Sequence, residues 1–89
     1  MLMIEAVHLE RGTTLQHISS FRWRNTSTDN TGETSRAGMV DWIENKNGKA
    51  YVANGTQAVQ VTVVHSDPPY LRSQPDETTN DNLLSLPRF

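Results

Sequence analysis

The 89-residue chain contains no cysteine. Neither a disulfide framework nor a thiolate zinc site can therefore form, and stability must come from packing alone. The chain also lacks any apolar run long enough to cross a bilayer, and Glu5 interrupts the N-terminal apolar residues before a secretion signal could form. These absences lead us to expect a cytoplasmic protein that does not associate with membranes.

An excess of positive charge is absent as well. The formal net charge is -2, whereas a non-specific DNA binder normally needs a basic face that releases counterions. Only 35% of the residues are hydrophobic, and 24 are Ser, Thr or Asn, which indicates long polar loops. A chain of this length can bury one modest core, so we expect a single compact α+β domain over residues 1–89.

The segment Thr34–Tyr51 is the only stretch with the pattern of an amphipathic helix. Its apolar residues fall on one stripe, with the tryptophan at the edge of that stripe: Met39, Val40, Trp42 and Ile43. Thr34 or Ser35 is suited to be the N-cap residue, and Gly48 is suited to end the helix in the left-handed conformation. We predict that this is the sole long helix.

Residues 3–10 and 18–24 have the pattern of a β-hairpin connected through Arg11–Gln16. In both strands the apolar alternation slips by one position after an isoleucine, Ile4 in the first and Ile18 in the second. A β-bulge produces such a slip, because one extra residue restores the apolar face. Coincidence is the alternative explanation of the shared pattern.

A second hairpin is indicated by Asn54-Gly55, a strong turn signal. If these two residues are the centre of the turn, Ala53 pairs with Thr56. The helix-facing side of this hairpin then carries Ala50, Val52, Val59, Val61 and Val63, and the opposite side carries Tyr51, Gln60, Thr62 and Val64. Asp67-Pro68-Pro69 should end the strand, and Tyr70 to Ser73 should add a short edge strand.

Two polar segments, 25–33 and 74–82, contain turn-forming residues and no large apolar side chain, so we expect mobile loops there. Asp81 can cap one helical turn over residues 82–85. The apolar residues that follow predict that segment 83–89 docks on the core.

The expected fold class is therefore α+β. A small, mostly antiparallel sheet of four to five strands is covered on one face by a single helix. The expected order is ββαββ, followed by a short C-terminal strand and the docked tail.

Four segments form a recognisable series: F-R-W at 21–23, S-R-A-G-M-V-D-W-I-E-N-K-N-G-K-A-Y-V at 35–52, P-P-Y-L-R at 68–72 and D-N-L-L-S-L-P-R-F at 81–89. Together they resemble a family of short bacterial and phage-associated domains of unknown function. The resemblance implies a compact α+β domain and brings no activity or site residues. Gly38 departs from the family pattern, which has a glutamate there that would complete a capping box with Ser35.

No catalytic or metal-binding motif is present. His8, His17 and His65 are not at metal-ligand spacing, and no serine lies in a nucleophile-elbow sequence. Asp41 and Glu44 share a helix face, which is more typical of a solvated surface than of an acid/base pair. We therefore expect no enzyme activity, no metal and no cofactor.

The segment Phe21-Arg22-Trp23-Arg24 places its aromatic residues on one strand face and its arginines on the other. We interpret both tryptophans of the chain as core residues. The arginines could hold an anion, or stack on a base, on a sheet face shared with His8, Tyr51 and Gln60. Alternatively, they form cross-strand ion pairs, with Glu10 as the expected partner.

The functional hypothesis is a non-catalytic module that binds a protein or a small anionic ligand. It would act as a homodimer through the sheet face or the sheet edge, with tentative binding residues Arg22, Arg24, Tyr51, Gln60 and His8. The alternative is a nucleic-acid-associated accessory protein that uses the Arg22/Arg24 strand, which the net charge does not favour.

Overall fold

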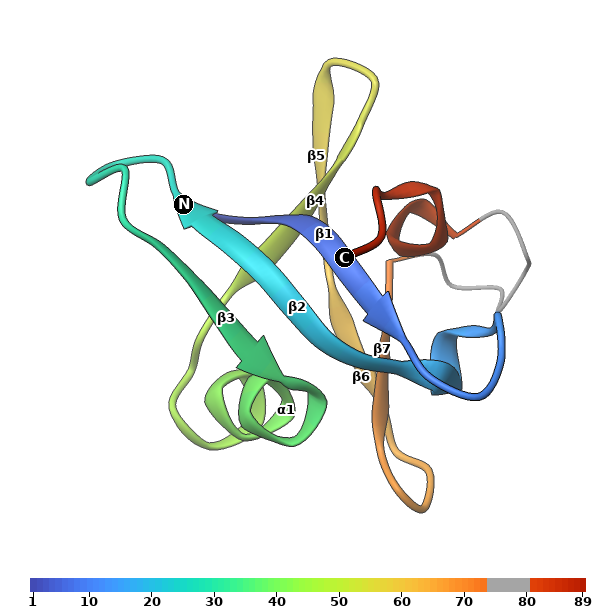
Figure 1. Ribbon diagram of the computed structural model, residues 1–89. Coiled ribbons are helices and arrows are strands. Elements are labelled where there is room, and N and C mark those ends of the chain that lie inside the picture. The colour runs from blue at the N-terminus through green and yellow to red at the C-terminus, as the bar shows by residue number, and fades with distance from the viewer. Residues whose placement is uncertain (74–80) are drawn as a thin grey trace.

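The computed structural model describes residues 1–73 and 81–89. Its main feature is a five-stranded sheet with the strand order β3-β2-β1-β4-β5, accompanied by a two-stranded sheet of β6 and β7 (Figure 1). The strands are β1 (Leu2–Leu9), β2 (Ile18–Asn25), β3 (Thr31–Ser35), β4 (Ala50–Asn54), β5 (Gln57–Gln60), β6 (Thr62–Val64) and β7 (Tyr70–Arg72). The helices are α1 (Arg36–Asn45) and the short 3-10 helices η1 (Leu15–His17) and η2 (Asn82–Ser85). The expected α+β class is confirmed.

Within residues 1–73 and 81–89, no helix has the length and apolar character that a membrane span requires.

The first hairpin pairs β1 with β2 in antiparallel orientation, and its register shifts twice. One shift lies between Ile4 and Ala6, and the other lies opposite the step from His8 to Leu9, where Ser19 is the extra residue. Both predicted bulges are thus confirmed. They allow Ile4 and Val7, three residues apart, to be buried on the same sheet face.

The expected loop over 25–33 is shorter than predicted, because Thr31–Ser35 forms the edge strand β3 beside β2. The helix α1 then carries the chain across the sheet to β4, which pairs with β1 in parallel orientation. A crossover of this kind returns the chain in the direction of the strand it left. The predicted ββαββ order and mostly antiparallel pairing are therefore only partly correct: the sheet is mixed.

The helix α1 begins where predicted and ends earlier than predicted. Ser35 is its N-cap residue, and the Ser35 hydroxyl accepts a hydrogen bond from the Gly38 N–H at 3.1 Å. At the other end the left-handed residue is Asn47, with φ 56°, rather than Gly48. The predicted apolar stripe is confirmed, because Met39 is buried and its neighbours on the stripe pack against the core.

In the second hairpin the turn lies one residue later than predicted. Asn54 pairs with Gln57, and Val52 pairs with Val59. Gly55 is therefore the first central residue of a two-residue turn, with φ 63°, a position that requires the left-handed region. Because the register moves by two residues, the side chains of β4 and β5 keep their predicted faces.

The predicted single strand after this turn is interrupted at Val61, which is buried. Beyond it, β6 leaves the main sheet and pairs with β7. The strand predicted near Tyr70 is thus confirmed, but it belongs to a separate sheet. Val63 pairs with the buried Leu71 in that second sheet instead of lying in the main one.

The C-terminal segment packs against the core, as predicted. Leu83 is fully buried, and Val7 of β1 forms backbone hydrogen bonds with Pro87 and Phe89. The C-terminal end of the chain accordingly lies beside β1 (Figure 1). Asp81 caps η2 by accepting a hydrogen bond from the Leu83 N–H. The predicted loop 74–82 lies outside the described residues over 74–80, and at its end Asp81 is buried rather than exposed.

The buried side chains form one hydrophobic cluster between the main sheet and the elements that cover it. We call the covered side of the sheet the inner face and the opposite side the outer face. The cluster consists of Ile4, Val7, Leu15, Ile18, Phe21, Met39, Ala50, Val52, Val61, Tyr70, Leu71 and Leu83.

Candidate functional site

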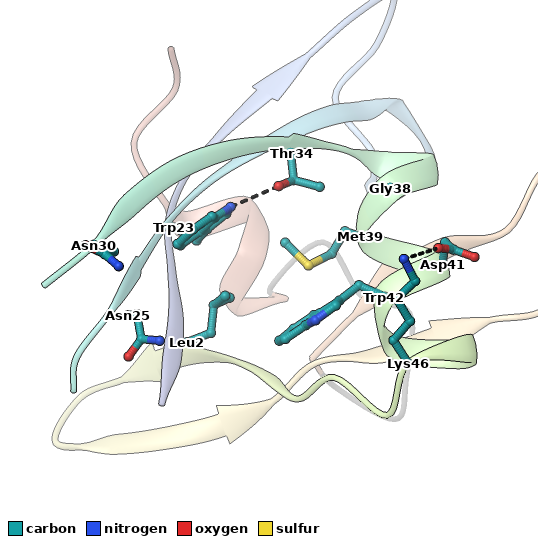
Figure 2. A pocket seen from close by; sticks show the side chains of 10 residues that line it. All are labelled: Leu2, Trp23, Asn25, Asn30, Thr34, Gly38, Met39, Asp41, Trp42 and Lys46. Carbon is teal, nitrogen blue, oxygen red and sulfur yellow. Dashed lines mark hydrogen bonds and ion pairs between the residues drawn. The ribbon is translucent and has the colours of Figure 1, made fainter. Parts of the chain in front are cut away.

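A pocket of about 560 Å³ lies between α1 and the inner face of β1, β2 and β3. Figure 2 shows Trp23 and Trp42 on opposite sides of this pocket, with Met39 between them and Leu2 beside them. Its remaining lining residues are Asn25, Asn30, Thr34, Gly38, Asp41 and Lys46. A pocket of this size, with aromatic and apolar walls and several polar groups, can hold a small molecule.

Each tryptophan of the pocket is packed against a glycine. Gly32 of β3 pairs with Trp23, and a Cβ added to Gly32 would lie 2.8 Å from Cε2 of the indole. Gly48 lies in the same way against the ring of Trp42, where an added Cβ would overlap three ring carbons. The two glycines thus provide the flat surfaces against which the two rings lie.

Trp23 is further held by a hydrogen bond. Its indole N–H donates to the hydroxyl of Thr34 at 2.9 Å, across the β2–β3 pair (Figure 2). The indole of Trp42 forms no such hydrogen bond within the described part of the chain, and neither tryptophan is fully buried. The prediction that both tryptophans are core residues is therefore only partly correct, because each also faces the pocket.

The polar groups of the pocket lie at its two ends (Figure 2). At one end are Asn25 and Asn30. The side-chain carbonyl of Asn25 accepts a hydrogen bond from the Ser27 N–H at 2.9 Å, and the side-chain NH₂ of Asn25 remains available. The Asn30 side chain makes no hydrogen bond within residues 1–73 and 81–89. Amide groups in this state can pair with a ligand.

At the other end Asp41 and Lys46 form an ion pair at 3.9 Å. Asp41 also accepts a hydrogen bond from the Asn45 amide at 2.7 Å. The two formal charges compensate each other, so the described lining of the pocket has no net charge.

The residues predicted as binding residues lie on the outer face, as expected from alternation. Arg24, Met3, Tyr51 and Gln60 pair in succession across β2, β1, β4 and β5, and directly paired residues share a face. Arg22 lies on the same face, two residues before Arg24. No lining residue of the pocket between α1 and the sheet comes from this group.

Acidic neighbours compensate both arginines. Arg24 lies 3.1 Å from Glu5 and 3.3 Å from Asp29, and Arg22 lies 3.7 Å from Glu33. The hydrogen bond and charge of Glu5 raise the pKa of Arg24 above its ordinary value. Cross-strand ion pairing was thus correctly anticipated, but the expected partner Glu10 lies 3.5 Å from His8 instead.

His8 and Arg22 both lie against Phe89, the last residue of the sequence. The ring of Phe89 is 5.7 Å from the His8 ring and 4.1 Å from the guanidinium carbon of Arg22. The His8 ring nitrogen also forms a hydrogen bond with the Phe89 backbone carbonyl. Phe89 therefore covers the part of the outer face that was predicted to bind an anion.

The described residues contain no group of three or more His, Asp or Glu side chains placed to hold a metal ion. His65 pairs with Glu44 of α1, remote in sequence from the other two histidines.

Sequence patterns alone did not identify the pocket, because a tryptophan on an apolar stripe has the pattern of a core residue. One signal was available. The chain has only two tryptophans, and Gly48 follows Trp42 by six residues at the end of the helix. The contact between Trp23 and Gly32 depends on the β2–β3 register, which the polar sequence of β3 does not indicate.

Comparison with known proteins adds the family and no function. No curated protein and no solved structure matches this chain. One family matches residues 3–87, nearly the whole chain, and its description reads "Protein of unknown function (DUF3892)". The chain belongs to this family.

Proposed function

We propose that this protein is a non-catalytic binding module that holds a small molecule with a flat apolar group between Trp23 and Trp42. The supporting observation is the pocket of about 560 Å³ with one indole on each side. Aromatic rings bury a large area and prefer stacked or edge-to-face partners, which a flat ligand supplies. Gly32 and Gly48 keep the rings in place while adding no side chain to the pocket.

The lining chemistry supports binding rather than catalysis. The titratable groups of the pocket are Asp41 and Lys46, and each has the other as its charged partner. A general base needs a free carboxylate or imidazole within reach of a reacting proton. No histidine or serine lines the pocket within the described residues.

Ligand-observed NMR with a set of small aromatic compounds tests this proposal. We expect several flat compounds to bind and to compete with one another, and we expect Trp42→Ala to abolish their binding. Tyr51→Ala, which removes an aromatic ring from the outer face, is the matched control and should leave binding unchanged. Absence of binding at millimolar concentration, or binding that Trp42→Ala does not change, would reject the proposal.

A second proposal concerns self-association through the outer face, as a homodimer. Phe89 lies against His8 and Arg22 on one part of the outer face. Another part exposes Ala53 and Ala58 beside the half-buried Met3 and Tyr51. The strand β5 is a sheet edge with no charged residue, and such edges pair readily with another strand. The exposed outer face and the edge of β5 are therefore next to each other, and one dimer interface could include both.

Sedimentation velocity at micromolar concentration tests the dimer. We expect a dimer that Ala58→Lys dissociates, because a charged side chain on the outer face of the edge strand opposes pairing. A 10.0 kDa monomer over the whole concentration range would remove the dimer proposal and leave the pocket proposal unaffected.

The alternative function, a nucleic-acid-associated accessory protein, has weaker support. The ion pairs of Arg22 and Arg24 with acidic residues reduce the charge available to phosphates. It remains a prediction from the sequence, and salt-dependent oligonucleotide binding would test it.

A further inference from the structure

We infer that the ligand of the pocket is a neutral planar heterocycle with an amide-type edge, that is, a carbonyl beside an N–H group, as in a uracil or hypoxanthine base. The inference rests on the proposed function and specifies its ligand. Three features of the pocket support it: the stacking surfaces, the absence of net charge and the available amide groups.

The stacking surfaces favour a flat ring over a branched aliphatic group. Trp23 and Trp42 lie on opposite sides of the space, and the Trp23 ring is held in orientation by Thr34 (Figure 2). A planar ligand in this space would present one face to each indole, which a branched aliphatic group cannot do. Stacking on aromatic side chains is tolerant of the particular base, because every base has a flat face.

The charge of the lining favours a neutral ligand. Asp41 and Lys46 lie 3.9 Å apart, so an anion bound beside Lys46 would also lie near the Asp41 carboxylate. A cation bound between the indoles would have the ammonium of Lys46 at the same end of the pocket. The small anionic ligand expected from the sequence therefore does not suit this site.

The hydrogen-bonding groups favour a ligand with both a donor and an acceptor on one edge. Asn30 offers a carbonyl and an NH₂ group, and Asn25 offers its NH₂ group at the same end of the pocket. The amide edge of a heterocycle is the complement of an asparagine side chain, with one donor and one acceptor on each partner. A hydrocarbon ring could not form hydrogen bonds with these amide groups, which would then bond only to water.

Isothermal titration calorimetry with four nucleosides provides the test: uridine, inosine and their N-methylated forms 3-methyluridine and 1-methylinosine. Methylation removes the N–H donor and keeps the ring. We expect uridine or inosine to bind. The methylated form of the nucleoside that binds should bind about tenfold more weakly, because one or two hydrogen bonds are lost. Uridine 5′-monophosphate should bind no more tightly than uridine.

Two variants test the assigned groups. Asn30→Ala should weaken nucleoside binding about five- to tenfold. Asn54→Ala removes the same amide from the β4–β5 turn, which does not line the pocket, and should leave binding unchanged. Both residues are exposed, so neither change should alter folding. Trp42→Phe keeps a smaller stacking surface and should retain weakened binding.

The outcomes separate this inference from the proposed function. If flat compounds without an amide edge, such as quinoline, bind as tightly as the nucleosides, the ligand class is wrong and the pocket remains a binding site. If no flat compound binds, both are wrong. If the monophosphate binds more tightly than uridine, the neutral-ligand inference is wrong. Tighter binding of a six-nucleotide oligouridylate than of uridine would contradict the neutral-ligand inference in the same way and would favour single-stranded RNA as the ligand.

Discussion

The substitution Gly32→Ala tests most directly whether the tryptophan pocket is built as described. A Cβ at this position would lie 2.8 Å from Cε2 and 3.0 Å from Cη2 of Trp23, and closer still to Cζ2. Carbon atoms in contact are separated by about 3.5 to 4.0 Å. The indole must therefore move by roughly 1 Å, away from β3 and toward the pocket.

The expected loss of stability follows from three contributions. Displacing the ring weakens the 2.9 Å hydrogen bond from Trp23 to Thr34, which contributes about 1 kcal/mol. Forcing a methyl group into a packed contact costs about 1 to 3 kcal/mol. Replacing glycine by alanine also stabilises the folded protein by about 0.4 to 1 kcal/mol, because the unfolded chain with alanine has less conformational entropy to lose. We expect a net destabilisation of about 1 to 3 kcal/mol.

Urea unfolding followed by circular dichroism and by tryptophan fluorescence measures this change. Because the chain has only two tryptophans and both line the pocket, the emission spectrum reports on the pocket itself. Thr31→Ala, an exposed change in the same strand, is the control and should shift stability by less than about 0.5 kcal/mol. A Gly32→Ala protein that is as stable as the original, with unchanged emission, would refute the proposed contact.

Four further changes probe other parts of the structure by the same unfolding measurement. Gly48→Ala should destabilise the protein by a similar amount and alter the emission of Trp42, since its Cβ would overlap that ring. Asp81→Ala should cost about 3 kcal/mol or more, because the buried carboxylate accepts hydrogen bonds from Ser73 and Leu83; a loss below about 1 kcal/mol would argue against this. Deleting residues 83–89 should lower the melting temperature by several degrees, and an unchanged melting curve would show that the tail does not stabilise the core. Arg24→Ala should cost less than about 1 kcal/mol, because its ion pairs are solvent-accessible, and a larger loss would give them a structural role.

The elements that sequence patterns predicted well are those with a strong local apolar signal. The two bulges of the first hairpin were visible as slips in alternation after Ile4 and Ile18, and the register confirms both. The stripe on α1 was predicted for the same reason, and the capping of η2 by Asp81 from an equally local polar signal. In each case neighbouring residues in the chain carry the whole signal.

The strand β3 was missed because its sequence, T-G-E-T-S, contains no apolar residue. These residues form a strand because their backbone pairs with β2, and nothing in the five residues themselves indicates that pairing. Missing β3 also concealed the crossover through α1, and with it the parallel pairing of β4 to β1. The mixed sheet could therefore not be predicted.

The candidate site shows the same division. Alternation correctly placed Arg22, Arg24, Tyr51 and Gln60 on the outer face, but it could not show that Glu5, Glu33 and Asp29 neutralise the arginines. Nor could it place Gly32 beneath Trp23. The search for function consequently moves from the outer face to the pocket beside α1.

The sequence by itself determined the α+β class, the one long helix, the two bulged strands and the faces of the side chains in β1, β2, β4 and β5. These properties follow from the period of the apolar pattern and from cap and turn residues, all of which act over a few neighbouring positions. Only the tertiary structure decided which glycine lies against which tryptophan, which acid pairs with which arginine, and that the two indoles line one pocket. Those relations depend on strand register and on the path of the crossover, which bring together residues distant in the chain.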